Sequence, residues 1–213
     1  MVEAKNVEVH FPSVDAAKFA SKDDYLRNIV VIADLRGNGV FMPEFQRYAK
    51  TADCGIIMSQ STMHSLDKLM DSGYDPFTKY VTGATIDQAK RNYAAWKEVK
   101  DSYEAAQADH TLSPEESKER KLKIYDAFET LVHNLPRGFE LWSTVTMSYF
   151  ELKTIVIQRA SHKNIEDWGS FVKFCYSLPK FRELCGLTDK KLDFDKIFPL
   201  FDRLASESPT SSV

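Results

Sequence analysis

Two side chains that could bind an anion follow an apolar helical segment in the C-terminal third of the chain. The segment contains Ile155-Val156-Ile157 and ends on Arg159, and His162 follows shortly after. A guanidinium carries N–H donors in a fixed plane and keeps its charge when it is partly buried. We therefore expect the helix to hold Arg159 against an anion, or against ring oxygens that gain negative charge during a reaction.

A second group of candidate ligands surrounds the start of a predicted helix over residues 62–70. Ser59 and Ser61 precede this helix, and Thr62 begins it. Unpaired backbone N–H groups at a helix start and neighbouring hydroxyls suit a phosphate. The same serines could instead be simple N-caps, which is the ordinary role of serine at this position.

The cationic candidates also have ordinary structural explanations. Arg159 could serve the negative end of its helix dipole, and His162 could be a surface or capping residue. Arg47 and Lys50 fall in a predicted short helix over residues 42–50, where they could simply be solvated. No single residue distinguishes these ordinary roles from a binding site, which only several residues occurring together can indicate.

Length and composition describe an ordinary globular chain. It has 213 residues, of which 43% are hydrophobic and 28% charged, with a net charge of −3. We expect one domain over residues 1–206 and a disordered Ser/Pro-rich tail over residues 207–213. The negative net charge argues against binding to duplex nucleic acid or to an anionic membrane. No apolar run reaches the ~20 residues that cross a bilayer.

Cysteine and histidine usage indicates neither disulfides nor a metal site. Cys54, Cys175 and Cys185 are odd in number and lack C-x-x-C spacing, and the N-terminus has no basic-then-apolar signal pattern. We expect reduced thiols in a cytoplasmic protein. Cys54 has no neighbouring base that would make it a nucleophile. The five histidines show no metal-ligand spacing.

Hydrophobic periodicity predicts one helix-rich α/β domain. A turn is expected over residues 36–39, and residues 51–61 are expected to be irregular. The predicted strands cover residues 7–11, 28–35 and 139–146. The predicted helices cover residues 14–20, 42–50, 62–70, 86–108, 113–135, 147–159, 165–177 and 192–205.

The two longest predicted helices, 86–108 and 113–135, form an antiparallel hairpin around a polar turn. On the first, Tyr93, Trp96 and Tyr103 are typical of a core stripe rather than of a platform for stacked bases. The second opens with Ser113 as a capping residue, followed by a proline and two acids. An apolar face on this second helix carries Leu122, Tyr125, Phe128, Leu131 and Val132.

Two segments of the chain resemble the flavin-dependent thymidylate synthases. The first runs from Glu44-Phe45-Gln46-Arg47-Tyr48 to Ser61-Thr62-Met63-His64, and the second from Leu135 to about Leu184. Both occur in the family order with a helical hairpin between them, so that the resemblance covers about residues 28–185. The sequence is most similar to a divergent, phage-type branch with an S-T-M-H element and an R-x-x-H-x-x-x-E-W-like element, which here runs from Arg159 to Trp168.

The resemblance implies an α/β (α+β) fold with a central mixed or antiparallel sheet, assembled as a homotetramer. It implies FAD, methylenetetrahydrofolate and NADPH as cofactors, and dUMP as the pyrimidine nucleotide monophosphate that is the substrate. In this family a methylene unit moves to C5 of the pyrimidine, and reduced flavin supplies the hydride. A phage-encoded member would act in the host cytoplasm.

The resemblance also implies roles for individual residues. Arg159 matches the arginine that polarises the pyrimidine. Residues expected at the nucleotide phosphate are Ser61 and Arg47, together with Ser59 from the helix-start geometry. Residues expected to contact FAD are His162, Tyr48, Lys50 and His64.

The sequence departs from the family pattern at cationic positions. Met63 stands where the family has an arginine, and Val132 or His133 where it often has another. Three functions therefore stay open. The chain could be a flavin- and folate-dependent C5 methylase (or hydroxymethylase) that converts dUMP to dTMP. It could be a non-catalytic relative that binds a nucleotide or a partner. It could also be an unrelated helical scaffold, for which Arg159 and Ser61 should lie far apart.

Overall fold

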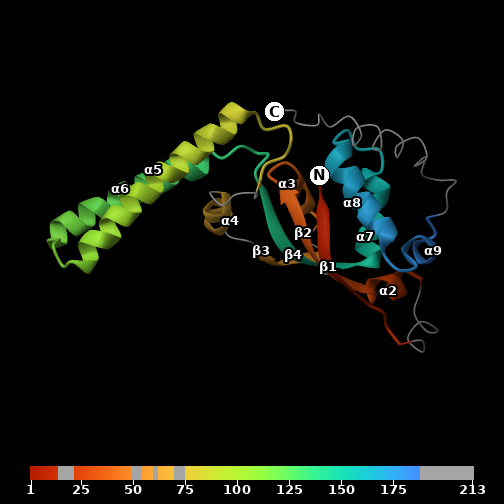
Figure 1. Ribbon diagram of the computed structural model, residues 1–213. Coiled ribbons are helices and arrows are strands. Elements are labelled where there is room, and N and C mark those ends of the chain that lie inside the picture. The colour runs from red at the N-terminus through yellow and green to blue at the C-terminus, as the bar shows by residue number, and fades with distance from the viewer. Residues whose placement is uncertain (14–21, 49–53, 60–61, 70–74, 188–213) are drawn as a thin grey trace. The chain divides into compact units, whose positions relative to one another are not determined.

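The computed structural model describes residues 1–13, 22–48, 54–59, 62–69 and 75–187 (Figure 1). The helices expected over residues 14–20 and 192–205, and the expected tail, lie outside these ranges. The chain divides into two compact units. One comprises Met1–Gly37, Phe41–Ser59 and the chain from Trp142 onwards, and the other comprises Asn38–Val40 and Gln60–Leu141. Each unit is described by itself.

The first unit is built on a four-stranded sheet with the strand order β1-β2-β4-β3. The strands are β1 (Glu3–His10), β2 (Val30–Asn38), β3 (Cys54–Ser59) and β4 (Glu140–Ser148). β1 is antiparallel to β2, and β3 is antiparallel to β4. The amide of Tyr149 donates to the Ile29 carbonyl, and the Thr144 hydroxyl donates to Asp34. These two contacts show that β2 and β4 also run antiparallel, which confirms the expected fold class.

Two strands differ from the sequence prediction. β2 extends to Asn38 and so includes most of the turn expected at residues 36–39. Within it, Gly37 lets α3 approach closely, since a Cβ there would lie 2.7 Å from Met42 Sδ. β3 occupies part of a segment expected to be irregular. Among the described strands it pairs with β4 alone, and it changes register between Ile56 and Met58. An edge strand with a broken register lacks the alternation that identifies a strand in the sequence.

Helices on the first unit complete its core. They are α2 (Lys22–Arg27), α3 (Phe41–Phe45), α7 (Tyr149–Arg159), α8 (Ile165–Ser177) and α9 (Phe181–Cys185). α7 and α8 lie together beside the sheet in Figure 1, and both match their predicted ranges closely. α3 is shorter than expected, and α2 and α9 were not expected. The core joins Val31 and Leu35 of β2 to Ile155 of α7 and Trp168 of α8.

The second unit contains α4 (Thr62–Leu69), α5 (Gly83–Ala108) and α6 (Pro114–His133). α5 and α6 form the predicted antiparallel hairpin. Ser113 and Glu116 form a capping box at the start of α6, as the sequence pattern indicates. The expected core stripe of α5 is confirmed, because Tyr93, Trp96 and Tyr103 are all buried.

The chain enters and leaves the helical hairpin at one place. The amide of Thr78 donates to the Gly138 carbonyl over 2.9 Å, and the amide of Glu140 donates to the Pro76 carbonyl over 2.7 Å. The rings of Phe77 and Phe139 pack edge to face between these bonds. Among the described residues, no helix is long and apolar enough to cross a membrane.

Candidate functional site

Arg159 is the centre of a cluster of polar and aromatic side chains in the first unit. Its Nε donates to the Tyr48 hydroxyl over 2.8 Å, and that hydroxyl donates to Gln158 over 3.0 Å. The guanidinium carbon lies 4.5 Å from the centroid of the Trp168 ring, a cation–π distance. The Arg159 side chain is only 17% exposed. Its orientation is therefore fixed from two sides, as a catalytic or binding arginine requires.

Glu44 provides the negative charge opposite Arg159. Its Oε2 lies 3.3 Å from Nη1 of Arg159 and accepts the indole N–H of Trp168 over 2.9 Å. The same oxygen lies 3.8 Å from Nε2 of His162. We call these residues, Glu44, Tyr48, Arg159, His162 and Trp168, the Glu44–Arg159 cluster. The sequence predicts an anion beside Arg159, and in the structure the carboxylate of Glu44 is such an anion.

Aromatic packing explains why Glu44 lies at this position. Phe41 and Phe45 are one helical turn apart on α3 and stack on each other. Phe41 also packs against Trp168, and both phenylalanines pack against Phe171 of α8. Since both phenylalanines are fully buried, they hold the short α3 against α8, and Glu44 is positioned next to the indole N–H.

The two helix starts in this part of the chain are capped by side chains. Ser148 accepts the amide of Glu151 at the start of α7, and Asn164 accepts the amide of Asp167 at the start of α8. Ile155 and Val156 of α7 are buried. Arg159 lies one turn beyond them on the same face, and its side chain therefore leaves the core where α3 and α8 meet.

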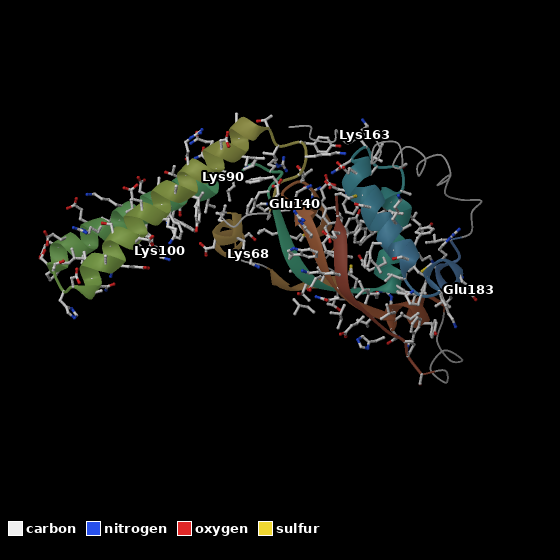
Figure 2. All side chains as sticks on the ribbon, in the orientation of Figure 1. Lys68, Lys90, Lys100, Glu140, Lys163 and Glu183 are labelled. Atoms are coloured by element: carbon white, nitrogen blue, oxygen red, sulfur yellow. The ribbon has the colours of Figure 1, made fainter. Side chains whose placement is uncertain are left out.

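His162 lies in the turn between α7 and α8, one residue before the labelled Lys163 in Figure 2. Its Nδ1 accepts the amide of Asn164 over 3.2 Å. The other nitrogen, Nε2, therefore carries the proton in the neutral ring and faces Glu44. His162 also packs edge-on to Trp168. At 28% exposure, the ring borders solvent and could contact a ligand.

The structure brings three of the predicted site residues together: Arg159, Tyr48 and His162 belong to one cluster. Arg47 is exposed in the turn after α3. Ser59 ends β3 and His64 lies on α4, but their side chains lie outside the described part of the chain, and so do Ser61 and Lys50 entirely.

Glu44 and Trp168 are cluster members to which the sequence assigns no role. Glu44 and Tyr48 are four residues apart, a spacing that places two side chains on one face of a helical turn. This spacing is the only local signal for Glu44. The contact of Glu44 with Arg159 depends on packing between α3, α7 and α8, which a local sequence pattern does not contain.

The two cysteines with described side chains are unsuited to nucleophilic catalysis. Cys175 and Cys185 are buried and free. Burial raises the pKa of Cys175 well above its ordinary value and raises the pKa of Cys185 to about 12. Both therefore remain thiols at neutral pH. No group of three potential metal ligands occurs in the described part of the chain.

The chemistry of the cluster fits a heterocyclic ring edge better than a phosphate. Arg159 and His162 offer N–H donors, and Glu44 lies between them as an acceptor. An imide edge, such as that of uracil or of the flavin ring, presents carbonyl acceptors on both sides of an N–H and is complementary to this order. The opposite charges of Glu44 and Arg159 compensate each other, so that a phosphate would need further cations.

The fold class of this protein is mixed α/β, with a four-stranded antiparallel sheet. Thymidylate synthase X (ThyX) from Helicobacter pylori, solved with FAD and dUMP, is a similar structure with 11% sequence identity and a TM-score of 0.44. That match covers 86% of this chain and 95% of the other. A flavin-dependent thymidylate synthase ThyX from the same organism, complexed with FAD and dUMP, is 12% identical with a TM-score of 0.39, over 76% of this chain and 73% of the other. No family model and no curated protein matches the sequence.

Proposed function

We propose that the Glu44–Arg159 cluster binds the base of a pyrimidine nucleotide beside a flavin. The chain would then catalyse flavin- and folate-dependent C5 methylation or hydroxymethylation, most simply of dUMP to dTMP. One observation supports this proposal above others. The two segments that resemble the flavin-dependent thymidylate synthases are far apart in the sequence, yet Tyr48 of the first and Arg159 of the second share a hydrogen bond.

Arg159 would polarise the pyrimidine. Within the described residues its Nε and Nη1 have partners, and Nη2 could donate to a ring oxygen. Negative charge that develops on this oxygen when the pyrimidine ring is activated for bond formation by C5 would be stabilised by a guanidinium that is already oriented. Tyr48 and Trp168 would maintain this orientation.

FAD is the cofactor that the proposal requires. Tyr48 and His162 would hold its ring. The bound flavin would supply the reducing equivalent for the new C5 substituent. Lys50 and His64 are further proposed contacts, carried by the resemblance alone. The same holds for methylenetetrahydrofolate and NADPH as co-substrates and for a homotetramer. Ser61, Ser59 and Arg47 are proposed to bind the nucleotide phosphate.

The test is ligand binding and C5 chemistry by the purified full chain. We expect added FAD to bind, and dUMP to bind more tightly than a nucleoside without phosphate. With methylenetetrahydrofolate and NADPH present, tritium placed at C5 of dUMP should be released to water. Arg159→Lys should weaken dUMP binding by about tenfold or more, because an ammonium lacks the planar donor pair.

Arg91→Lys is the matched control, since Arg91 is exposed on α5 and donates to its helix neighbour Gln88 over 2.8 Å. This variant should bind dUMP as the wild type does. A chain that binds neither FAD nor dUMP would contradict the proposal, and so would an Arg159→Lys variant with unchanged dUMP affinity.

A non-catalytic nucleotide-binding or interaction protein is the second candidate. The ion pair between Glu44 and Arg159 favours it, because a compensated arginine stabilises developing negative charge less well than an unpaired one. The loss of cationic residues at Met63 and Val132 agrees with it. This candidate predicts dUMP binding that depends on Arg159 without release of tritium from C5.

A further inference from the structure

The two carboxylate oxygens of Glu44 have different surroundings. Oε2 accepts the indole N–H of Trp168 over 2.9 Å and lies 3.3 Å from Nη1 of Arg159. Among the described residues, Oε1 has no hydrogen bond. The Glu44 side chain is 30% exposed, so that a ligand at the Glu44–Arg159 cluster can reach it. Glu44 therefore uses one acceptor within the protein and offers the other to a ligand.

Trp168 determines which oxygen is the available one. Its side chain is fully buried, and an indole N–H can only donate. A buried donor needs an acceptor, and Nη1 of Arg159 approaches the same oxygen as a second donor. The side chain at position 44 must therefore present an oxygen inwards, and only its outer atom is available to a ligand.

The outer oxygen of Glu44 and the guanidinium of Arg159 place an acceptor beside a donor. In the pyrimidine site proposed above, Nη2 of Arg159 donates to a ring oxygen. Beside the two ring carbonyls of uracil lie N1, which carries the sugar, C5, which must face the flavin, and N3, which is left for Oε1. N3 of uracil carries a hydrogen that Oε1 can accept, whereas N3 of cytosine carries a lone pair that would face the carboxylate.

We propose that Glu44 selects uracil over cytosine by accepting the N3–H of the base with Oε1. This inference rests on the proposed function, because it takes Arg159 as the group that contacts a ring oxygen. A cytosine that moved to pair its amino group with Glu44 would carry C5 away from the flavin. Polar groups that fit one base and stay unpaired with another of equal size discriminate strongly between the two.

Glu44→Gln tests this selection because it converts the available acceptor into a donor. The amide oxygen should take the inner position, where Trp168 and Arg159 donate, and the amide N–H groups should replace Oε1. Titration calorimetry on the full-length chain saturated with FAD would compare dUMP with dCMP, which share the sugar and the phosphate.

The ratio of the two dissociation constants is the quantity to measure. The wild type should bind dUMP at least about tenfold more tightly than dCMP, and Glu44→Gln should reduce this ratio by about tenfold or more. Loss of the negative charge strengthens the binding of both nucleotides alike and cancels in the ratio. dCMP should therefore gain more from the replacement than dUMP does.

Glu183→Gln is the matched control, since Glu183 is exposed on α9 (Figure 2). This variant should keep the wild-type ratio. Equal affinities of the wild type for dUMP and dCMP would overturn the proposal, and this comparison stays decisive if circular dichroism shows that Glu44→Gln does not fold. An unchanged ratio in a folded Glu44→Gln variant would also overturn it, and weaker FAD binding in that variant would assign Glu44 to the imide of the flavin instead.

These outcomes differ from a failure of the proposed function. If dUMP binding depends on Arg159 but the ratio does not depend on Glu44, the pyrimidine site stands and only the role of Glu44 is wrong. A chain that binds no nucleotide would overturn both.

Discussion

Glu44 and Arg159 form an ion pair in which Oε2 of the carboxylate lies 3.3 Å from Nη1 of the guanidinium. The same oxygen accepts the indole N–H of the buried Trp168. Glu44 therefore has two opposing effects on the site. It fixes the direction of Arg159, and it compensates the positive charge that would attract an anionic ligand. A ligand that needs this charge must compete with Glu44.

The first prediction concerns this competition. Glu44→Gln removes the negative charge and keeps an oxygen that can accept from Trp168. We expect dUMP to bind about three- to tenfold more tightly, measured by titration calorimetry, because Arg159 would no longer be compensated. Glu98→Gln on the exposed surface of α5 is the control and should have no effect. Weaker binding in Glu44→Gln would instead show that the carboxylate, as an acceptor for a ring N–H, contributes more to binding than it costs by compensating Arg159.

The second prediction concerns the stability of the cluster. Trp168→Phe removes the donor to Glu44 and part of a fully buried side chain. We expect a loss of about 1–3 kcal/mol in the free energy of unfolding, measured by urea denaturation. Trp142→Phe is the control. Since Trp142 is only half-buried, its replacement should cost less; an equal loss in both variants would contradict the role assigned to the indole N–H.

Much of this arrangement can be predicted from the sequence, and the limits have physical causes. The apolar spacing of α5 to α8 and the capping residue Ser113 are local signals, and these helices match their predicted ranges. β3 is not predicted from the sequence, because an edge strand with an irregular register has no clear alternation. The proximity of Arg159 and His162 follows from their short separation in the sequence, since α7 ends at Arg159 and His162 lies in the turn after it. The pairing of Arg159 with Glu44 does not, because it depends on how α3 packs against α8.

The third prediction concerns Asp34 on the sheet. Hydrogen bonds from Thr144 and Asn6 lower the pKa of this carboxyl group, and Thr144 has the larger effect. Thr144→Val should raise this pKa towards its ordinary value, which an NMR titration of the Asp34 carboxyl group can measure. Thr146→Val, on the same strand, should leave it unchanged. An unaltered Asp34 titration in Thr144→Val would contradict the assignment.

The lowered pKa of Asp34 also gives the sign of a pH effect on stability. A carboxyl group whose pKa is lower in the folded chain stabilises the fold above its unfolded pKa, about 4. This contribution is lost as the pH falls from there through the folded pKa. The wild type should therefore exceed Thr144→Val in unfolding free energy at neutral pH by more than in strong acid. A difference that grows on acidification would have the wrong sign.

The fourth prediction concerns thiol reactivity. Burial raises the pKa of both Cys175 and Cys185, and a thiol reacts through its thiolate. In a Cys54→Ser background, which leaves only these two thiols, labelling by a disulfide reagent at neutral pH should be at least about a hundredfold slower than in urea. Rapid labelling of the folded chain would show that these thiols are accessible.

The bonds that join residues 76–78 to residues 138–140 have a consequence for engineering and for sequence variation. The whole segment between them begins and ends at neighbouring points. A short turn could therefore close the chain there at little entropic cost. Insertions and deletions of whole helical turns between residues 79 and 137 should be tolerated far better than changes of equal length elsewhere. The two ends of this segment are also suitable positions at which to graft a different pair of helices.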